Sequence, residues 1–599
     1  MQGLILAAGM GKRLKELTQN NTKCMVKVNG VTLIDRMLHQ LDACGLKRIV
    51  IVVGYEGQKL RDYIDTLSVR TPIEYVENSV YYKTNNIYSL YLAKDMLLED
   101  DTLLLESDVI FEDEVLRAIL DDPRPTLALV DKYESWMDGT CVKLSEDDCI
   151  EAFVPGSKFR FEDIPYYYKT VNIYKFSREF SGKFYVPFLD AYSKALGNNE
   201  YYEQVLRVIT MLDDPQIRAK RLSGEKWYEI DDEQDLDIAG SIFAPTTDQK
   251  VRAVQARYGG YWRYPHLLDF CYLVNPYFPP RRLIDEMKAS FETLLTQYPS
   301  GMQVNSLLAA KNFGVHREHI VVGNGAAELI KSIAESLRGA TGVVRPTFEE
   351  YPNRLTCHEV TFVPQNRDFS YTAEELMAFF AEHPVENLVL INPDNPSGNY
   401  ISKADVLRLA GWCLEREILF VLDESFVDFA DEEDNTCIRE DILRRFPNML
   451  VMKSISKSYG VPGLRLGVLA SSDEQRIAAI KKDVSIWNIN SFGEFYMQIA
   501  EKYNKDYRAA LVQLRQERRR FQEALAALPG LRVIPSQANY VMVELLDGRS
   551  ATELTARLLE KDVLVKDLSA KLSGRPYLRL AVRNTQDNDR LLAALREAL

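Results

Sequence analysis

The sequence has few features of a secreted, membrane-spanning or nucleic-acid-binding protein. Its eight cysteines among 599 residues form no CxxC pair, so no zinc cluster is visible and reduced thiols are favoured over disulfides. No run of 18 uninterrupted apolar residues occurs and no basic leader precedes the first apolar run. The formal net charge of −14 argues against general binding to nucleic acid, which requires clustered Lys and Arg. We expect a cytoplasmic protein.

The chain is long enough for two catalytic domains. Hydrophobic residues make up 46% of it, which is ample for several cores. Short apolar runs alternate with amphipathic stretches on both sides of a break at Pro245 and Gly259–Gly260, the pattern of strands and crossover helices in α/β sheets. We predict an N-terminal domain over 1–240, a linker over 241–263 and a C-terminal domain over 264–599, whose large α/β sheet precedes a smaller α+β subdomain.

A glycine turn follows the first predicted strand, in GLILAAGMGKR at residues 3–13. Gly9 and Gly11 allow backbone amides to approach a phosphate, while Lys12 and Arg13 supply positive charge. The Rossmann pattern requires glycine at position 14 and the P-loop requires it at position 6, but leucine stands at both. Taken alone, the turn is better explained as an ordinary tight turn.

Carboxylates follow predicted strands at two places, Asp108 in LLLESDV and Glu229 with Asp231 in WYEIDD. Such hard oxygen ligands are those that Mg²⁺ prefers. Transfer to a triphosphate's α-phosphorus needs metal and cationic side chains to offset crowded negative charge. Taken alone, Asp108 suits a capping or surface role, and the resemblance described next implies that the two groups together hold magnesium.

LAAGMGKRL, then Lys23, VTLIDRML and IVIVVGY, resembles the nucleotidyltransferases of the choline-phosphate cytidylyltransferase type. The resemblance implies a Rossmann-like fold, CTP as the nucleotide, Mg²⁺ on Asp108, Glu229 and Asp231, and catalytic roles for Arg13 and Lys23. Thr22 stands before Lys23 where many relatives have proline. The implied nucleotide contacts are Ala7, Ala8, Gly9, Gly11, Lys12, Asn86, Ser89 and Glu106.

The acceptor in this family is an aminoalkyl phosphate or its phosphonate counterpart. Trp136 and Asp138 suit an ammonium group, because aromatic faces and carboxylates bind cations. Lys169 and Asn172 match a segment that closes the site in relatives, and Lys169 suits an anion. The run Tyr166–Tyr168 is a further candidate, and a packing or surface role stays open for each of these aromatic residues.

Four motifs in the C-terminal half describe a second chemistry: NPSG with Asn395, LDES with Asp423, SISK with Lys457 and PGLRLG with Arg465. Pyridoxal phosphate needs a lysine that binds it covalently, a carboxylate that keeps its ring nitrogen protonated, and cations and amides for its phosphate. We assign Lys457 and Asp423 to the first two tasks and Asn395 to the ring hydroxyl. The predicted phosphate contacts are Arg465, Ser454, Ser456 and the amides of Gly325 and Ala326 at a helix start.

This half resembles the fold-type I aminotransferases of the histidinol-phosphate aminotransferase and threonine-phosphate decarboxylase branch. The resemblance implies that Phe348 stacks on the cofactor ring, that Arg579 pairs with a substrate carboxylate, and that Tyr298 reaches the neighbouring subunit's cofactor in a homodimer. Arg583 is a second candidate anion contact, although a surface salt bridge is favoured. Phe426 stands where many relatives have a tyrosine that donates to the cofactor, which keeps the decarboxylase branch open.

A module that makes an amine and a module that consumes one suggest a single pathway. The fusion resembles the bifunctional 2-aminoethylphosphonate cytidylyltransferase/transaminase enzymes of phosphonate biosynthesis. We expect transamination of phosphonoacetaldehyde by an amino acid donor, then CMP transfer from CTP to 2-aminoethylphosphonate. The alternative is decarboxylation of an O-phospho amino acid, followed by cytidylylation of the aminoalkyl phosphate. A further hypothesis is that one module has lost its activity and serves only a regulatory or scaffolding role. The presence of Asp108 and Lys457 argues against it.

Overall fold

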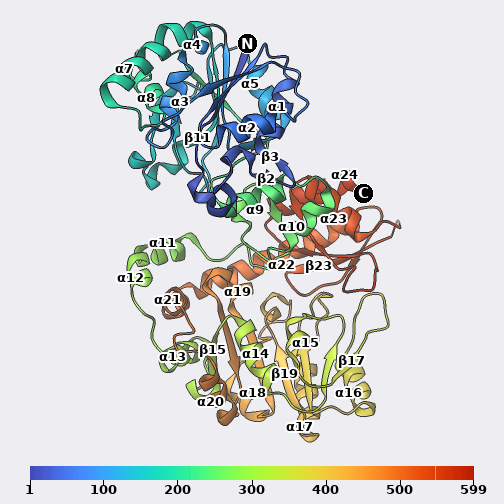
Figure 1. Ribbon diagram of the computed structural model, residues 1–599. Helices are drawn as coiled ribbons and strands as arrows, with labels where there is room; N and C mark the ends of the chain where they lie inside the picture. The colour runs from blue at the N-terminus through green and yellow to red at the C-terminus, as the bar shows by residue number, and fades with distance from the viewer. Residues whose placement is uncertain (213, 215, 547) are drawn as a thin grey trace. The chain divides into compact units, whose positions relative to one another are not determined.

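The computed structural model describes residues 1–212, 214, 216–546 and 548–599. It divides into two compact units, Met1–Pro265 and His266–Leu599 (Figure 1). Strands and helices alternate in both units, so the predicted α/β fold class is confirmed. Among the described helices, none has the length and apolar character that crossing a membrane requires.

A nine-stranded mixed sheet forms the centre of the first unit. The entirely buried strand β1 (Gln2–Ala7) lies between β4 (Ile49–Val53) and β6 (Thr102–Glu106) and is parallel to both. Because the carboxyl ends of parallel strands meet at one edge, the glycine turn after β1 and Asp108 after β6 are brought together. The other strands are β5 (Ile73–Glu77), β8 (Leu127–Lys132), β9 (Cys141–Leu144), β10 (Ile150–Val154), β11 (Tyr167–Phe176) and β12 (Arg218–Arg221).

Helices cover both faces of this sheet (Figure 1). Side chains alternate along β1, so that Ile5 and Ala7 join one core cluster while Leu4 and Leu6 join the other. The first cluster includes α1 (Leu33–Asp42), α2 (Gly57–Ile64) and α5 (Asp113–Leu120), and the second includes α3 (Asn86–Leu92), α7 (Val186–Leu196) and α8 (Glu203–Ile209). A separate ribbon pairs β7 (Val109–Phe111) with β13 (Trp227–Glu229), so Glu229 lies opposite Val109.

The segment expected as a linker is partly helical and groups with the first unit. Helix α9 (Glu233–Ile242) ends before Pro245, and α10 (Thr247–Gln255) follows at once. The Thr246 side chain accepts a hydrogen bond from the Gln249 amide, a cap that restarts the helix. The proline therefore marks a break between two helices, and the division into units falls at Pro265.

The second unit is built on a seven-stranded sheet in the order β15-β21-β20-β19-β18-β16-β17. Strand β21 is antiparallel to its neighbours, whereas β16 to β20 run parallel. The strands are β15 (Ile320–Asn324), β16 (Thr341–Val344), β17 (Glu359–Phe362), β18 (Asn387–Ile391), β19 (Leu419–Asp423), β20 (Met449–Ser454) and β21 (Leu466–Ala470). One core cluster includes α14 (Ala326–Ser336) and α20 (Glu474–Asp483), and the other includes α16 (Ala373–Glu382), α17 (Lys403–Glu415) and α18 (Glu440–Arg445).

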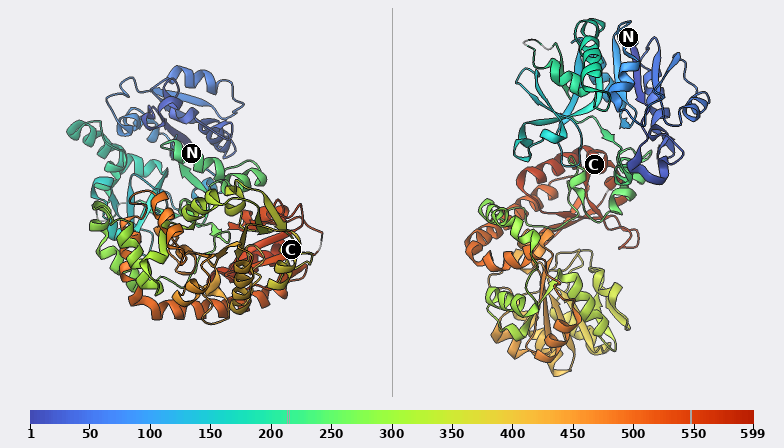
Figure 2. Two further views of the ribbon diagram at one scale, coloured as in Figure 1. Left: turned by 90° about the horizontal axis from the view of Figure 1, so that it is seen from below. Right: turned by 60° about the vertical axis from the view of Figure 1, so that its left-hand side comes forward.

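A smaller α+β subdomain, coloured orange to red in Figures 1 and 2, completes the second unit. Its antiparallel sheet has the order β22-β23-β26-β25. The strands are β22 (Leu531–Ile534), β23 (Tyr540–Leu545), β25 (Lys566–Asp567) and β26 (Tyr577–Ala581), and the helices are α22 (Asn504–Ala526), α23 (Ala551–Glu560) and α24 (Thr585–Ala598). Strand β26 carries Arg579, so the sheet fixes that side chain in the unit.

Glycine at position 467 allows the start of α14 to lie against β21. A Cβ atom there would stand 2.5 Å from the backbone nitrogen of Ala326, closer than a carbon can approach. Gly325, with φ 74°, forms the turn between β15 and this helix. The close approach therefore depends on Gly467 and Gly325, whose packing against each other's segments the sequence motifs did not predict.

We predict that Gly467→Ala destabilises the second unit by about 1–3 kcal/mol, because the added methyl group must displace helix backbone. Chemical unfolding followed by circular dichroism measures the change. Gly463→Ala is the matched control, since a Cβ at Gly463 has no atom within 4 Å. Equal stability of the two variants would contradict the packing described for α14.

Candidate active sites

A cavity of about 670 Å³ lies at the carboxyl ends of β1 and β6 in the first unit. Gly11 is left-handed, and a Cβ on it would come within 3.0 Å of Lys23, so the glycine turn packs directly on that lysine. Most residues predicted for the N-terminal site line this cavity. They are Ala8, Gly9, Gly11, Lys12, Arg13, Lys23, Asn86, Ser89, Glu106, Asp108, Asp138, Lys169, Asn172, Glu229 and Asp231.

Three carboxylates and two cations form the centre of the cavity. Asp108, Glu229 and Asp231 each bring an oxygen to within 4.8 Å of the others. The Lys23 Nζ lies 2.5 Å from Asp108 and 2.7 Å from Asp231. Arg13 adds a contact of 2.8 Å to Asp231. Burial alone would lower the pKa of Lys23, but the two carboxylates raise it above its usual value, so Lys23 stays charged.

The carboxylate cluster fits a divalent cation. Its donors are all oxygens, as Mg²⁺ prefers. The Oδ1 atom of Asp108 is buried and has no hydrogen-bond partner within the described part of the chain. A buried acceptor without a partner is costly, and a bound metal ion would satisfy it. Burial raises the pKa of Glu229 although the nearby Lys169 lowers it. A bound cation would stabilise the charged form of this carboxylate.

Lys169 and Asn172 hold Glu229 in place. The buried Lys169 Nζ lies 3.2 Å from Glu229 and donates hydrogen bonds to the Thr170 carbonyl and to the Asn172 side chain. Asn172, whose φ is 61°, donates to the other Glu229 oxygen at 3.0 Å. Both residues therefore fix one member of the carboxylate cluster, whereas the sequence led us to expect that they contact the acceptor.

The residues expected around the nucleotide also bond to one another. Asn86 donates to Glu106 at 2.8 Å and accepts from the Tyr202 amide at 3.0 Å. Ser89 accepts from Asn78 at 3.1 Å. Both reach the cavity, whereas Ala7 is buried at the end of β1 and does not line it.

The two side chains expected to bind an ammonium group lie in different surroundings. Trp136 stacks on Tyr228, with ring centroids 4.1 Å apart, and does not line the cavity. Asp138 lines the cavity mouth and is 74% exposed beside Arg13. A buried carboxylate in the cavity, Glu203, was missed by the sequence analysis, because NNEYYEQVL matches no motif.

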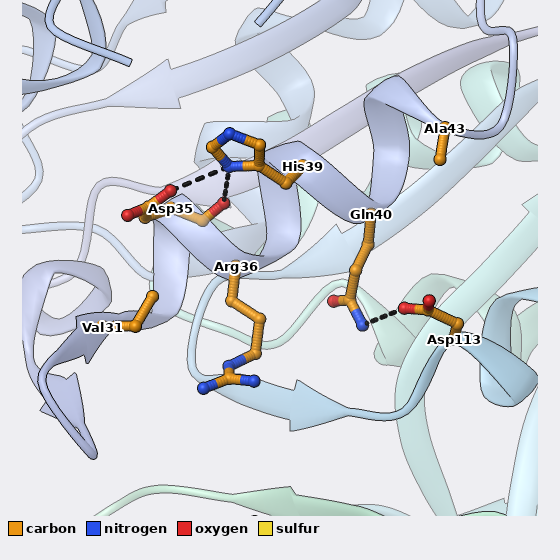
Figure 3. A pocket seen from close by; sticks show the side chains of 7 residues that line it. All are labelled: Val31, Asp35, Arg36, His39, Gln40, Ala43 and Asp113. Carbon is orange, nitrogen blue, oxygen red and sulfur yellow. Dashed lines mark hydrogen bonds and ion pairs between the residues drawn. The ribbon is translucent and has the colours of Figure 1, made fainter. Parts of the chain in front are cut away.

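A second hollow of the first unit, of about 440 Å³, lies along α1 (Figure 3). Its polar groups largely pair with one another: the His39 ring contacts Asp35 at 2.8 Å, and Gln40 donates to Asp113 at 2.9 Å. None of the predicted site residues lines it. We assign it no catalytic role.

In the second unit, Lys457 stands on the short helix α19 (Ile455–Ser458) directly after β20. Burial and the neighbouring Arg579 and Arg465 lower its pKa to about 8, although Asp423 opposes them. A substantial fraction of its amine is therefore neutral and nucleophilic near pH 8.

Asp423 ends the parallel strand β19 and is buried. It accepts hydrogen bonds from the Tyr351 hydroxyl at 3.0 Å and from the Ser425 amide at 2.9 Å. Burial raises its pKa, so a cationic ring nitrogen would stabilise its charged form. Tyr351 was not predicted, although it follows Phe348 by three residues in RPTFEEY.

Arg579 lies beside Asn395, to which it donates a hydrogen bond of 2.6 Å. It also donates to the Cys271 carbonyl at 2.9 Å. Its Nε atom is buried without a partner among the described residues, so the guanidinium retains a donor for a substrate anion. Arg583 instead pairs with Asp587 at 2.8 Å, the salt bridge that the sequence favoured.

The predicted phosphate contacts meet at the start of α14. A Cβ on Gly325 would lie 2.6 Å from the Arg465 guanidinium, and the Gly325 amide donates to the Arg465 carbonyl at 2.9 Å. Ser456 has a buried hydroxyl without a partner among the described residues, and Ser454 is also buried. An unpartnered hydroxyl, a guanidinium and a helix start fit a phosphate group, so these residues fit pyridoxal phosphate.

Of the other residues named from the sequence, Phe348 and Tyr298 are exposed, whereas Phe426 is buried. Phe348 is 41% exposed and Tyr298 is 80% exposed, with the Tyr298 ring against Trp487 at 4.7 Å. Phe426 is buried with its ring edge-on to Tyr540. The contact of Tyr298 with a partner subunit stays a prediction.

Comparisons with known proteins match both units. Residues 269–595 match the aminotransferase class I and II family, and residues 3–142 match the MobA-like NTP transferase domain. The whole chain is 32% identical over 602 residues to CMP-5'-(3-aminopropyl)phosphonate synthase of Streptomyces rubellomurinus, of which the match covers 95%.

Two matches concern the second unit. L-serine phosphate decarboxylase of Sulfurospirillum multivorans is 32% identical over 352 residues, which are 55% of this chain and 88% of that protein. The solved structure of a decarboxylase from the same organism is 30% identical with a TM-score of 0.53, and the match covers 59% of this chain and 96% of that one. The chain therefore belongs to the aminotransferase class I and II family and carries an NTP transferase domain at its N-terminal end.

Proposed function

We propose that the protein is a bifunctional enzyme that forms a small aminoalkyl phosphonate or phosphate in its second unit and joins it to CMP in its first. One observation carries the proposal: a single chain holds both side-chain clusters, and its match to CMP-5'-(3-aminopropyl)phosphonate synthase runs through both. The carboxylates and cations of the first unit suit a metal-bound triphosphate, and the cluster around Lys457 suits pyridoxal phosphate. Both substrates are small anions, in keeping with local cationic groups on an acidic chain.

In the first unit, a phosphonate or phosphate oxygen of the acceptor attacks the α-phosphorus of CTP. The bond to the bridging oxygen breaks, and pyrophosphate leaves. Arg13 and Lys23 neutralise the charge that builds on the phosphate oxygens. Asp108, Glu229 and Asp231 would hold Mg²⁺, which offsets the repulsion between the two anions. No protein nucleophile is required, because positioning and charge carry the displacement.

In the second unit, Lys457, Asp423 and the Arg465 cluster would hold pyridoxal phosphate, which supplies an electron sink for breaking a bond to the substrate's Cα. Arg579 binds the substrate's carboxylate through its free donors. Lys457 has a pKa of about 8, so its amine can both release and take up a proton at Cα near neutral pH.

Of the two reactions that the sequence left open, we propose decarboxylation of an amino acid that carries a phosphate or phosphonate group. The match to L-serine phosphate decarboxylase over 88% of that protein supports this choice, as does the buried Phe426. Transamination of phosphonoacetaldehyde to 2-aminoethylphosphonate by an amino acid donor is the second candidate, supported by the aminotransferase family match.

Product analysis by ³¹P NMR separates the two. Full-length protein with pyridoxal phosphate, CTP and Mg²⁺ receives either O-phosphoserine or phosphonoacetaldehyde with alanine. We predict carbon dioxide release and a CMP conjugate of a phosphate ester from O-phosphoserine. A third mixture replaces O-phosphoserine with 2-amino-4-phosphonobutyrate, the phosphonate analogue of a phospho amino acid. A CMP phosphonate formed only from phosphonoacetaldehyde would contradict decarboxylation and favour the second candidate. No CMP conjugate from any of the three mixtures would contradict both candidates.

We predict that Asp108→Asn lowers CMP transfer by on the order of 10³-fold, because the metal loses a carboxylate ligand. The reaction of the second unit should be unchanged. Pyrophosphate release measures the first activity and amine formation measures the second. Asp121→Asn, an exposed carboxylate at the end of α5, is the control and should keep both. Retained CMP transfer in the Asp108 variant would remove that residue from the site.

The lowered pKa of Lys457 predicts the pH dependence of cofactor binding. Only the neutral amine reacts, so the rate at which the apoprotein takes up pyridoxal phosphate should rise with pH and reach half its maximum near the pKa of about 8. Stopped-flow absorbance measures this rate. Arg579→Met removes a neighbouring positive charge and should move the midpoint to higher pH. A rate that still rises steeply above about pH 10, as for an ordinary lysine, would contradict the lowered pKa.

A further inference from the structure

The cavity of the first unit contains one carboxylate that the proposed reaction has not used. Glu203 is the first residue of α8, is 6% exposed and lines the cavity. Its Oε2 atom is buried and has no hydrogen-bond partner in the described residues. Among the described residues, the Tyr174 hydroxyl makes a long contact of 3.5 Å with its Oε1 atom, and the backbone N–H of Glu203 itself also bonds to the carboxylate. A buried carboxylate left this incompletely bonded is destabilising unless a ligand completes it.

The nearest cationic side chain does not satisfy Glu203. An ammonium group has three donors, and those of Lys169 are directed to Thr170, Asn172 and Glu229. Asn86 likewise donates to Glu106. Glu203 therefore faces the cavity as a hydrogen-bond acceptor that can carry negative charge, with Glu106 as a second carboxylate nearby. Burial raises the pKa of Glu203 to about 7, which a cationic partner would reverse.

Tyrosine rings line the cavity, and one of them, Tyr201, lies near Glu203. Tyr81, Tyr82 and Tyr201 line the same cavity. Tyr201 precedes Glu203 by two residues and is close enough for the Glu203 charge to act on its hydroxyl. Rings beside a carboxylate are the surroundings that an organic ammonium group prefers. Trp136, which the sequence suggested for this task, is occupied by its stack on Tyr228.

We propose that Glu203 receives the ammonium group of the aminoalkyl acceptor and selects amines over neutral acceptors of the same shape. This assignment rests on the proposed function of the first unit. The acceptor's phosphorus oxygens face Arg13, Lys23 and the metal cluster, and its ammonium group faces Glu203. Glu203 and the carboxylate cluster line the same cavity of about 670 Å³, so one small acceptor can meet both.

The test compares full-length wild-type protein with Glu203→Gln, which keeps shape and removes charge. The acceptors are 2-aminoethylphosphonate and 2-hydroxyethylphosphonate, with CTP and Mg²⁺, and pyrophosphate release is measured. We expect the variant to raise KM for the amine on the order of 10- to 100-fold, because a charge-assisted hydrogen bond is lost. KM for CTP should not change, and the preference for the amine over the alcohol should disappear.

Two further variants separate recognition from folding. Glu203→Asp retains the charge and should keep most of the preference for the amine. Glu179→Gln, an exposed carboxylate on α6 (Arg178–Phe180), should behave as wild type. Thermal unfolding of all variants tells a loss of structure from a loss of recognition, and the ratio of the two acceptors within one variant does not depend on the amount of folded protein.

The outcomes distinguish this inference from the function it rests on. If the wild-type protein transfers CMP to no aminoalkyl phosphonate or phosphate, the proposed function fails. If the wild type is active and Glu203→Gln keeps its preference for the amine, the role of Glu203 fails alone. A raised KM for CTP with an unchanged KM for the amine would assign Glu203 to the amino group of the cytosine base instead, and would also overturn the inference.

Discussion

Mutual repulsion between Asp108, Glu229 and Asp231 is the constraint around which the first unit's site is arranged. Three carboxylates within 4.8 Å of one another stay charged only if cations offset them. Arg13 approaches from a short 3-10 helix directly after the glycine turn, Lys23 from the next 3-10 helix, and Lys169 from β11. The site therefore depends on strands β1, β6 and β11 lying side by side, and their buried apolar faces fix that order.

In the second unit the groups that repel one another are cations. Lys457, Arg465 and Arg579 are cations brought close together, and the lowered pKa of Lys457 is the result. Asp423, itself buried, only partly compensates them. An anionic cofactor phosphate and a substrate carboxylate would complete the balance. The excess of negative charge in the first unit therefore points to a metal cation, and the excess of positive charge in the second unit points to anionic groups of a cofactor and a substrate.

Much of this arrangement could be predicted from the sequence, because motifs such as LAAGMGKR, NPSG and SISK place chemistry at strand ends. The sequence could not show that the Trp136 ring stacks on Tyr228, or that Lys169 forms an ion pair with Glu229. Those outcomes depend on contacts between distant segments. Glu203 was missed for the same reason, since only the fold reveals that its Oε2 atom has no hydrogen-bond partner in the part of the chain that the structure describes. We placed a domain boundary near Pro245 because proline occurs both in linkers and between helices, and the structure shows that it separates α9 from α10.

One sample of full-length protein tests the central claim that a single chain holds two working centres. After addition of pyridoxal phosphate it should absorb between about 400 and 430 nm. The same sample should release pyrophosphate from CTP when Mg²⁺ and 2-aminoethylphosphonate or O-phosphoethanolamine are supplied. The absence of either signal would contradict the claim of two working centres, and the signal that remained would show which unit is active.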